Sequence, residues 1–238
     1  MPKPARRSPA PVIAALAAFA CSAPALALEH TRLEPVWFET AAPDGGAGHT
    51  AQALLNLPPG WLIGDAGVVI LSDRTWPGLA RERLVAALLE EEAAVLEFDV
   101  AAARGPGPEN ARPEAPMAAE LVPGVRGAVT ALRRDAGAGL VVALGYGAGG
   151  EAAVLAASPE RTTVPEDTGL IAAASLGPGP ARFALGGAAP GRGWPVRAER
   201  LCGVLAKAAA PSEARAEAEC RRALLDPGEG RAVRLAGP

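Results

Sequence analysis

The feature that most constrains this chain is a glycine-rich turn at residues 145–150 (GYGAGG). The preceding residues 139–144 (GLVVAL) form a short apolar run that predicts a buried strand, and the following residues 151–157 (EAAVLAA) predict a helix. A strand that passes through a tight glycine turn into a helix is a building unit of parallel sheets, because parallel strands need crossover connections. The turn therefore favours an α/β fold.

The rest of the chain continues this alternation of strands and helices. Apolar runs predict further buried strands, and amphipathic runs predict helices. The strands are expected at residues 67–71, 93–100 and 169–176, and the helices at residues 79–92 and 118–135. The second helix contains Pro123 and Gly124, which could interrupt it. Such alternation predicts a three-layer α/β sandwich with a mostly parallel sheet.

Residues 28–60 and the loops complete this expected organisation. The first of these segments mixes short apolar stretches with turn residues and predicts an opening strand or hairpin. Ligands of parallel sheets bind beyond the carboxyl ends of the strands, so the loops at those ends should meet there. These loops are expected at residues 72–78, 99–105, 146–151 and 176–180.

Residues 1–27 have the pattern of a secretory signal peptide. Three basic residues are followed by an apolar run at residues 10–20 and a small-residue cleavage site, Ala25-Leu26-Ala27. The apolar run is shorter than the roughly 20 residues that a membrane-spanning helix needs. We therefore expect a periplasmic or secreted bacterial protein without a transmembrane segment after cleavage. Processing as a lipoprotein at Cys21 is the alternative.

The charge of the mature chain argues against some partners. Cleavage after Ala27 removes three of the 23 basic residues and none of the 26 acidic ones, which leaves a net charge of −6 on residues 28–238. No basic run remains, so nucleic acid and anionic membrane surfaces are disfavoured as partners. A length of this order predicts a single domain.

Two cysteines, Cys202 and Cys220, remain after the predicted cleavage. An even number in an exported protein suggests one disulfide. Both lie in alanine-rich helical patterns separated by Pro211-Ser212, so residues 196–225 are expected to form a disulfide-linked helical hairpin. Redox and metal chemistry are disfavoured, because there is no Cys-x-x-Cys pattern and no nearby histidine. We expect no cofactor and no metal.

Several pieces of the chain, taken in order, carry a family resemblance. They are residues 68–73 (VVILSD), 76–79 (WPGL), 95–99 (VLEFD) and 142–150 (VALGYGAGG). Together they resemble the α/β-hydrolase superfamily, and in particular its dienelactone-hydrolase-like branch, whose nucleophile stands at the centre of a Gly-x-Ser-x-Gly turn. The resemblance covers roughly residues 60–177, about half of the chain. It implies an α/β-hydrolase-like fold with a reduced C-terminal part.

The resemblance also implies where a catalytic site would lie. The nucleophile position falls on Gly147, and the oxyanion hole would use the N–H of Ala148 with one from the loop at residues 72–74. Asp73 falls where this branch often has an acid. The triad histidine should follow the turn, but the only histidines are His30 and His49, both upstream of it. A hydrolase scaffold without nucleophile and base is therefore expected to be inactive.

The resulting hypothesis is an exported, non-catalytic protein that binds a small acyl, lactone or carboxylate ligand. Its expected pocket and oxyanion loop consist of Ser72, Asp73, Arg74, Trp76, Tyr146, Gly147 and Ala148. All four tryptophans are expected in the core or in a pocket wall: Trp37, Trp61, Trp76 and Trp194.

Three other hypotheses remain open. A divergent esterase or lactonase would need Asp73, Asp99, Glu151 or His49 to converge in space. A structural or interaction protein would keep the glycines only because the turn needs them. A dinucleotide site would use residues 145–150 as Gly-x-Gly-x-x-Gly, but the pattern lies late in the chain and lacks a suitably placed acid.

Overall fold

The structure is a computed structural model that describes residues 31–41, 48–104, 118–158, 170–177, 182–185, 199–204, 218, 220 and 221. The predicted signal peptide and Trp194 lie outside the described residues, as do most of the predicted helical hairpin and most of the loop after residue 104. Among the described residues, no helix is long and apolar enough to cross a membrane.

The described strands form one seven-stranded sheet in the order β1-β2-β4-β3-β5-β6-β7. The strands are β1 (Arg32–Thr40), β2 (His49–Leu57), β3 (Ala66–Ser72), β4 (Ala94–Asp99), β5 (Leu140–Tyr146), β6 (Leu170–Leu176) and β7 (Arg182–Leu185). The four central strands, β4, β3, β5 and β6, run parallel, while β1, β2 and β7 pair antiparallel at the two edges. The sheet is therefore mixed, with the predicted parallel strands at its centre.

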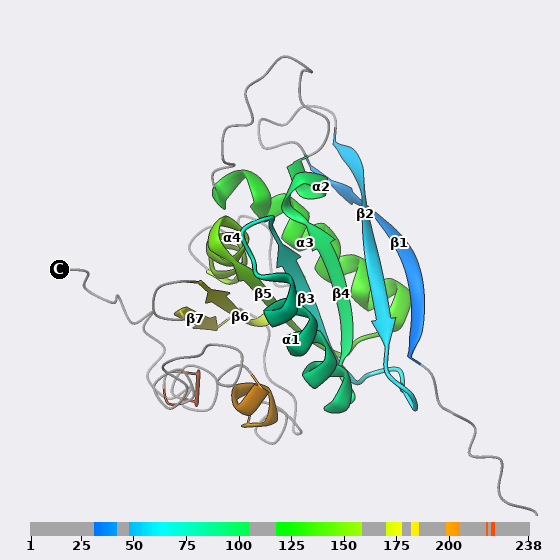
Figure 1. Ribbon diagram of the computed structural model, residues 1–238. Helices are drawn as coiled ribbons and strands as arrows, with labels where there is room; N and C mark the ends of the chain where they lie inside the picture. Colours follow the sequence, from blue (N-terminus) through cyan, green and yellow to red (C-terminus); the bar gives the residue numbers. More distant parts are fainter. Residues whose placement is uncertain are drawn as a thin grey trace, which may run out of the picture.

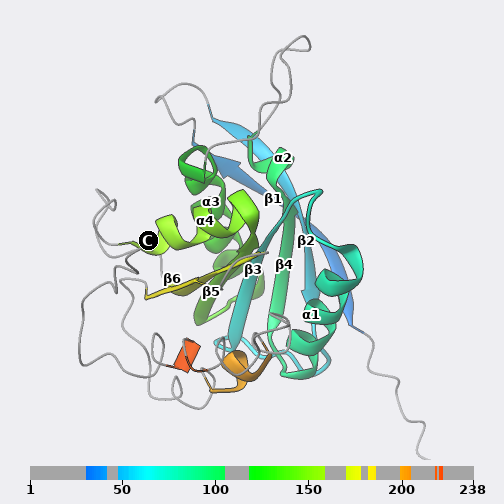
Figure 2. The same cartoon turned by 60° about the vertical axis from the view of Figure 1, so that its left-hand side comes forward.

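Helices cover both faces of this sheet (Figures 1 and 2). The helices are α1 (Gly78–Glu90), α2 (Val100–Arg104), α3 (Ala118–Ala136) and α4 (Gly147–Ala157), and residues 199–204 are also helical. Side chains of α2, α3 and α4 pack in one core cluster, whereas α1 and residues 199–204 pack in a second cluster. The predicted three-layer α/β architecture is thus confirmed.

Helix α3 is continuous through Pro123 and Gly124, where the sequence predicted a possible interruption. Pro123 is the sixth residue of the helix and removes one backbone donor. Gly124 permits close packing, because a Cβ at this position would lie 2.8 Å from the Cβ of Ala103 in α2. The glycine therefore serves the contact between two helices and does not end either of them.

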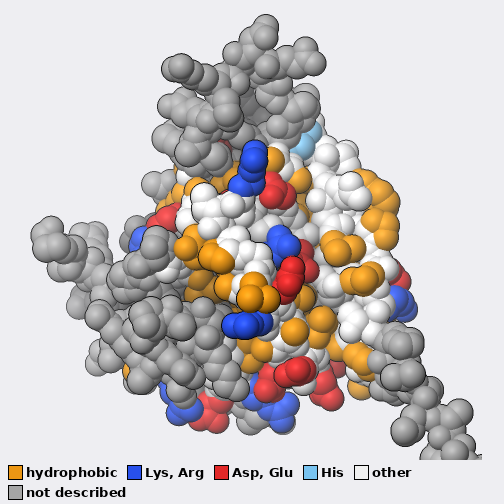
Figure 3. All heavy atoms as spheres, in the orientation of Figure 1, with side chains coloured by type: hydrophobic (Ala, Val, Ile, Leu, Met, Phe, Trp, Pro, Cys, Tyr) orange, Lys and Arg blue, Asp and Glu red, His pale blue; other side chains and the backbone are white. Residues whose placement is uncertain are grey.

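The opening segment forms the predicted hairpin, β1 paired with β2. Val36 and Phe38 point into the core, where the ring of Phe38 packs edge-on against Phe98. The opposite face of the hairpin is exposed, and Leu33 and Trp37 on it are more than half exposed. Figure 3 shows hydrophobic side chains at the surface on the side of the molecule where β1 and β2 lie. The expectation that Trp37 is a core or pocket-wall residue is therefore wrong. The alternation along β1 places odd-numbered residues on the outer face.

The predicted cysteine pair is joined in the structure. Cys202 and Cys220 form a disulfide with a Cα–Cα distance of 5.5 Å, and both residues are fully buried in the α1 side of the core. Leu201 and Val204 pack in the same cluster. The disulfide therefore joins two C-terminal segments of the chain, and both of its cysteines pack in the core on the α1 side of the sheet.

Candidate ligand site at the glycine turn

The carboxyl ends of the central strands meet at one edge of the sheet. Ser72 ends β3 and stands opposite Asp99, which ends β4, while Leu71 stands opposite Gly145 of β5. The β3–α1 loop and the glycine turn therefore lie side by side, as the sequence predicted. This edge holds the residues that the resemblance had assigned to a catalytic site.

Three of the four glycines in the turn are required by packing. A Cβ on Gly145 would overlap the backbone of Gly149, and a Cβ on Gly150 would overlap the Ser175 side chain. A Cβ on Gly149 would lie 3.0 Å from that of Leu71. The start of α4 thus packs directly on its neighbouring strands, and these glycines are explained without any function.

Gly147 differs from the other glycines in the turn. Its φ of +55° lies in the left-handed region, yet there is space around it. A Cβ at this position would lie 3.1 Å from Oδ2 of Asp73 and 3.9 Å from Oγ1 of Thr75, with no other neighbour within 4 Å. A side chain here would therefore press on the Asp73 carboxylate, which would have to shift slightly to accept it.

Asp73 is held in one orientation by its own loop. Its Oδ1 accepts three hydrogen bonds: from the Thr75 N–H at 2.8 Å, the Thr75 hydroxyl at 2.5 Å and the Trp76 N–H at 3.1 Å. This is an Asx turn, which is reason enough for an aspartate here. The other carboxylate oxygen, Oδ2, accepts no hydrogen bond from the described residues. It faces the position that a side chain of residue 147 would occupy. The turn that orders Asp73 thus presents one oxygen to the site.

Trp76 and Tyr146 form an aromatic pair beneath this edge. Their ring centroids are 5.5 Å apart and their planes differ by 21°, which is a stacked arrangement. Trp76 is buried and Tyr146 is half-buried in the core cluster on the α1 side. The pair links the β3–α1 loop to the end of β5, so it supports the geometry of Asp73 and Gly147.

The remaining predicted site residues have different surroundings. Ser72 is buried and its hydroxyl donates to the carbonyl of Phe98 at 3.3 Å, so it is a structural residue. Arg74 is exposed in the loop. Ala148 lies in the first turn of α4, whose first four N–H groups have no acceptor within the helix. Tyr146 precedes the helix without a side-chain cap.

The residues required for a divergent hydrolase have separate partners. The His49 side chain hydrogen-bonds to Thr40 and to the carbonyl of Ala102. Glu151 pairs with Arg182 at 2.5 Å, and Asp99 accepts from the Ala101 N–H at 2.7 Å. In the described part of the chain, no group of three His, Cys, Asp or Glu side chains is arranged to hold a metal ion.

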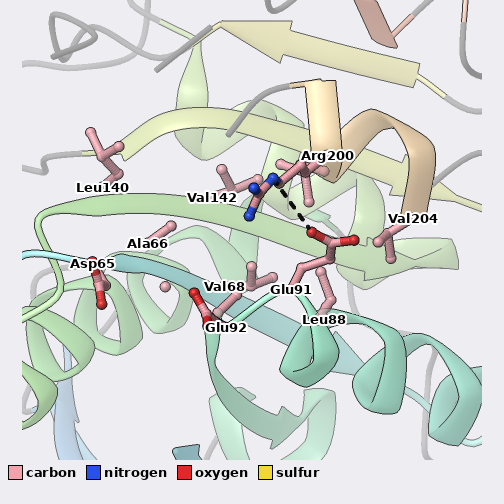
Figure 4. A pocket seen from close by; sticks show the side chains of 13 residues that line it. Asp65, Ala66, Val68, Leu88, Glu91, Glu92, Leu140, Val142, Arg200 and Val204 are labelled. Atoms are coloured by element: carbon pink, nitrogen blue, oxygen red, sulfur yellow. Dashed lines mark ion pairs between the residues drawn. The ribbon is translucent and has the colours of Figure 1, made fainter. Parts of the chain in front are cut away.

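A cavity of about 110 Å³ lies at the opposite end of the sheet, where β3 and β5 begin (Figure 4). Val68, Leu88 and Val142 line it, and Arg200 pairs with Glu91 at 3.8 Å beside it. The sequence analysis did not find this cavity, because residues 199–204 complete its wall only through long-range packing against α1. It is far from the glycine turn along the strands.

The topology and the turn define the class of the fold. Strand β5 passes through a tight turn with positive φ into α4, and the loop after β3 lies next to that turn. These are the two elements that build the nucleophile and the oxyanion hole in α/β hydrolases. The chain has an α/β-hydrolase-like fold, with Gly147 in the turn between β5 and α4.

Comparison with known proteins gives similar solved structures only. No protein-family model and no curated protein matches the chain. Est1E from Butyrivibrio proteoclasticus is 16% identical, with a TM-score of 0.39, over 54% of this chain and 48% of that one. A dienelactone hydrolase from Anabaena variabilis is 18% identical, with a TM-score of 0.39, over 62% of each chain. An esterase from Pyrococcus furiosus is 16% identical, with a TM-score of 0.42, over 55% of this chain and 49% of that one. The aligned part spans about half to three fifths of these proteins.

Proposed function

We propose that the chain is an exported α/β-hydrolase-fold protein that binds a small acyl or lactone ligand without hydrolysing it. The observation that carries this proposal is Gly147, which has the backbone conformation of a nucleophile turn but no side chain to attack a carbonyl. The sequence holds no histidine after the turn to act as a base. Without a nucleophile and a base, the site can still bind a ligand, but it lacks the groups that would hydrolyse it.

The ligand would bind between the start of α4 and the β3–α1 loop. The N–H of Ala148 lies in the first turn of α4, where backbone donors are available for a carbonyl oxygen. The position beside Gly147 is bounded by Asp73 and Thr75 and has no other described neighbour within 4 Å. A neutral acyl or lactone group suits this site better than a carboxylate, because the Asp73 carboxylate would repel a second negative charge.

The test is acylation of the chain by an activated ester such as p-nitrophenyl acetate. The wild-type protein should show no turnover, whereas Gly147→Ser or Gly147→Cys should accept one acyl group and stop, since no histidine follows to promote deacylation. Circular dichroism checks folding, because a side chain at this φ costs about 1–2 kcal/mol. Gly78→Cys, which adds a thiol at an open surface position, is the matched control for nonspecific acylation.

Wild-type turnover that is lost in Asp73→Asn would replace this proposal by a divergent hydrolase. Acylation of Gly147→Cys no faster than that of Gly78→Cys, with folding intact, would contradict an oxyanion site at the turn, because the thiol needs no added base to react. In that case the structural role of the turn glycines would be the better account, since packing already explains Gly145 and Gly150.

Export is the second part of the proposal. It is supported by the signal-like pattern of residues 1–27 and by the disulfide between Cys202 and Cys220, which an oxidising compartment would maintain. Expression of the full-length gene in a Gram-negative host, followed by fractionation and mass spectrometry, checks it. A soluble periplasmic product that begins at Leu28 is expected. A product with lipid on Cys21 would establish the lipoprotein alternative.

A further inference from the structure

We propose that the cavity at the amino ends of β3 and β5 binds a small primary ammonium ion that carries a short aliphatic chain (Figure 4). This site lies away from the glycine turn and goes beyond the function proposed above. The aliphatic chain would occupy the cavity, and the ammonium group would meet carboxylates at its rim. The apolar lining, the volume and the charge of the rim each support one part of this assignment.

The floor of the cavity is aliphatic and buried. Val68 of β3, Val142 of β5 and Leu88 of α1 line it, and each is at most 4% exposed. Leu201 and Val204 form another wall and are also buried. These side chains carry no polar atom, so a polar group placed among them would lose its hydrogen bonds to water. The ligand group that suits the floor is therefore apolar.

The volume sets the size of this apolar group. The cavity measures about 110 Å³. An apolar cavity of about 150 Å³ takes up benzene, so a smaller one of the same kind suits a short aliphatic chain. At the rim, the side chains of Arg200 and Glu91 are 58% and 40% exposed. A ligand can therefore bury its chain and keep a charged end at the solvent boundary.

The rim carries more negative than positive charge. Asp65, Glu91 and Glu92 line the cavity, and Arg200 is the single cationic side chain among its described lining residues. Nε of Arg200 lies 3.8 Å from Oε2 of Glu91, and an exposed pair at this distance is weak. Three carboxylates thus stand against one guanidinium. The excess negative charge attracts an ammonium group and repels a carboxylate.

Glu92 holds its carboxylate at this rim in an unfavourable backbone conformation. Its φ of 61° lies in the left-handed region, where glycine is the more stable residue. Glu92→Gly should therefore stabilise the protein and at the same time weaken binding of an ammonium ligand. Weaker binding by a more stable variant cannot be attributed to unfolding, so this substitution separates a binding role from a structural one.

The experiment compares three probes that share a butyl chain: n-butylammonium, 1-butanol and pentanoate. Each is titrated at about pH 7 into the full chain with its disulfide formed, where the amine is protonated and the carboxylate ionised. Backbone amide shifts in nuclear magnetic resonance report binding and its location. We expect shifts at residues 65–68, 91–93 and 200–204. Butylammonium should bind roughly tenfold or more tightly than pentanoate, with butanol between them.

Two variants and a matched control test the two parts of the site. Ala66→Leu adds three carbon atoms at a lining position at the start of β3, and should remove binding of all three probes. Glu92→Gln removes one rim charge and keeps the length of the side chain, so the preference for butylammonium over butanol should fall roughly two- to fivefold. Glu82→Gln makes the same change at an exposed position of α1 outside the cavity, and should leave the preference unchanged.

Three results would overturn the proposal. The first is equal affinity for butylammonium and pentanoate, because the rim would then not select a cation. The second is a set of shifts that avoids residues 65–68 and 91–93, or binding that persists in a folded Ala66→Leu. The third is unchanged butylammonium binding by Glu92→Gly, which also decides the question if Ala66→Leu does not fold.

Discussion

The Cβ that Gly145 lacks would fall on the backbone of Gly149, one turn into the following helix. The end of β5 and the start of α4 are therefore in direct backbone contact. We expect Gly145→Ala to lower the free energy of unfolding by about 1–3 kcal/mol or more, because the overlap is with backbone that cannot move aside. Urea denaturation measures this. Gly78→Ala, at an open position that begins α1, should be neutral or stabilising, and equal effects of both changes would contradict the packing argument.

Glu92 offers a substitution that should stabilise the protein. It follows α1 with a φ of 61°, and its N–H bonds to the carbonyl of Leu89 while the N–H of Ala93 bonds to that of Leu88. This is the Schellman arrangement, in which glycine is the favoured residue. Glu92→Gly should raise the free energy of unfolding by roughly 0.5–1 kcal/mol, after the larger backbone entropy of unfolded glycine is subtracted.

Thermal denaturation checks the Glu92 prediction. Glu82→Gly, at an exposed position inside the same helix, is the matched control and should be destabilising by about 1 kcal/mol. A loss of stability in Glu92→Gly comparable to that control would show that the left-handed conformation is not what limits this position.

Glu97 should make the stability of the fold depend on pH. Burial raises the pKa of Glu97, while Arg81 and the hydrogen bond from Asn56 lower it in part. Because the folded pKa exceeds the unfolded value, the folded state binds the proton more tightly. Ionised Glu97 therefore costs stability above its raised pKa, and that cost disappears as the pH falls below the unfolded pKa.

Glu97→Gln isolates this contribution. The difference in unfolding free energy between variant and wild type should favour the variant more at neutral pH than at about pH 4, since the wild-type residue is protonated at the lower value. Urea denaturation at the two pH values measures it. A difference that is independent of pH would mean that Glu97 titrates normally in the folded protein.

The disulfide should contribute substantially to stability. Cys202 and Cys220 are 18 residues apart, and closing a loop of that size stabilises by about 3 kcal/mol in the chain-entropy model. Thermal denaturation with and without reductant should show this loss, and Cys202→Ser with Cys220→Ser should reproduce it. In the double variant, reductant should have no effect. An unchanged melting temperature of the reduced wild type would contradict the stabilisation expected from restricting the unfolded chain.

The central strands were predictable because most of them are continuous apolar runs, as in residues 67–71 and 139–144, and such runs are buried on both faces of a sheet. The packing role of Gly124 in α3 was not predictable, since the glycine lies against Ala103 of α2, a contact between two helices that the local pattern does not reveal. The exposure of Trp37 depends on which face of β1 the helices cover.

The candidate site, like the fold, could be predicted from the sequence only in part. Gly147, Asp73 and the adjacent loops could be placed from the pattern of the turn and the order of the strands. The orientation of Asp73 could not, because it depends on hydrogen bonds from Thr75 and Trp76. Ser72 was assigned to the oxyanion loop, but its hydroxyl donates a hydrogen bond to the carbonyl of Phe98 on the neighbouring strand β4. Sequence spacing locates a residue at a strand end and does not fix where its side chain points.

Gly147 also has a consequence at the level of the gene. Glycine codons of the form GGY and serine codons of the form AGY differ in a single base, and a Cβ at position 147 would be tight only against the Asp73 carboxylate. A single mutation could therefore return a hydroxyl to the turn, whereas a histidine would have to arise separately on a later loop. The first step alone would give a protein that captures an acyl group and holds it. A single-base change at this codon would thus give a protein that is acylated only once, and it would not by itself give an enzyme.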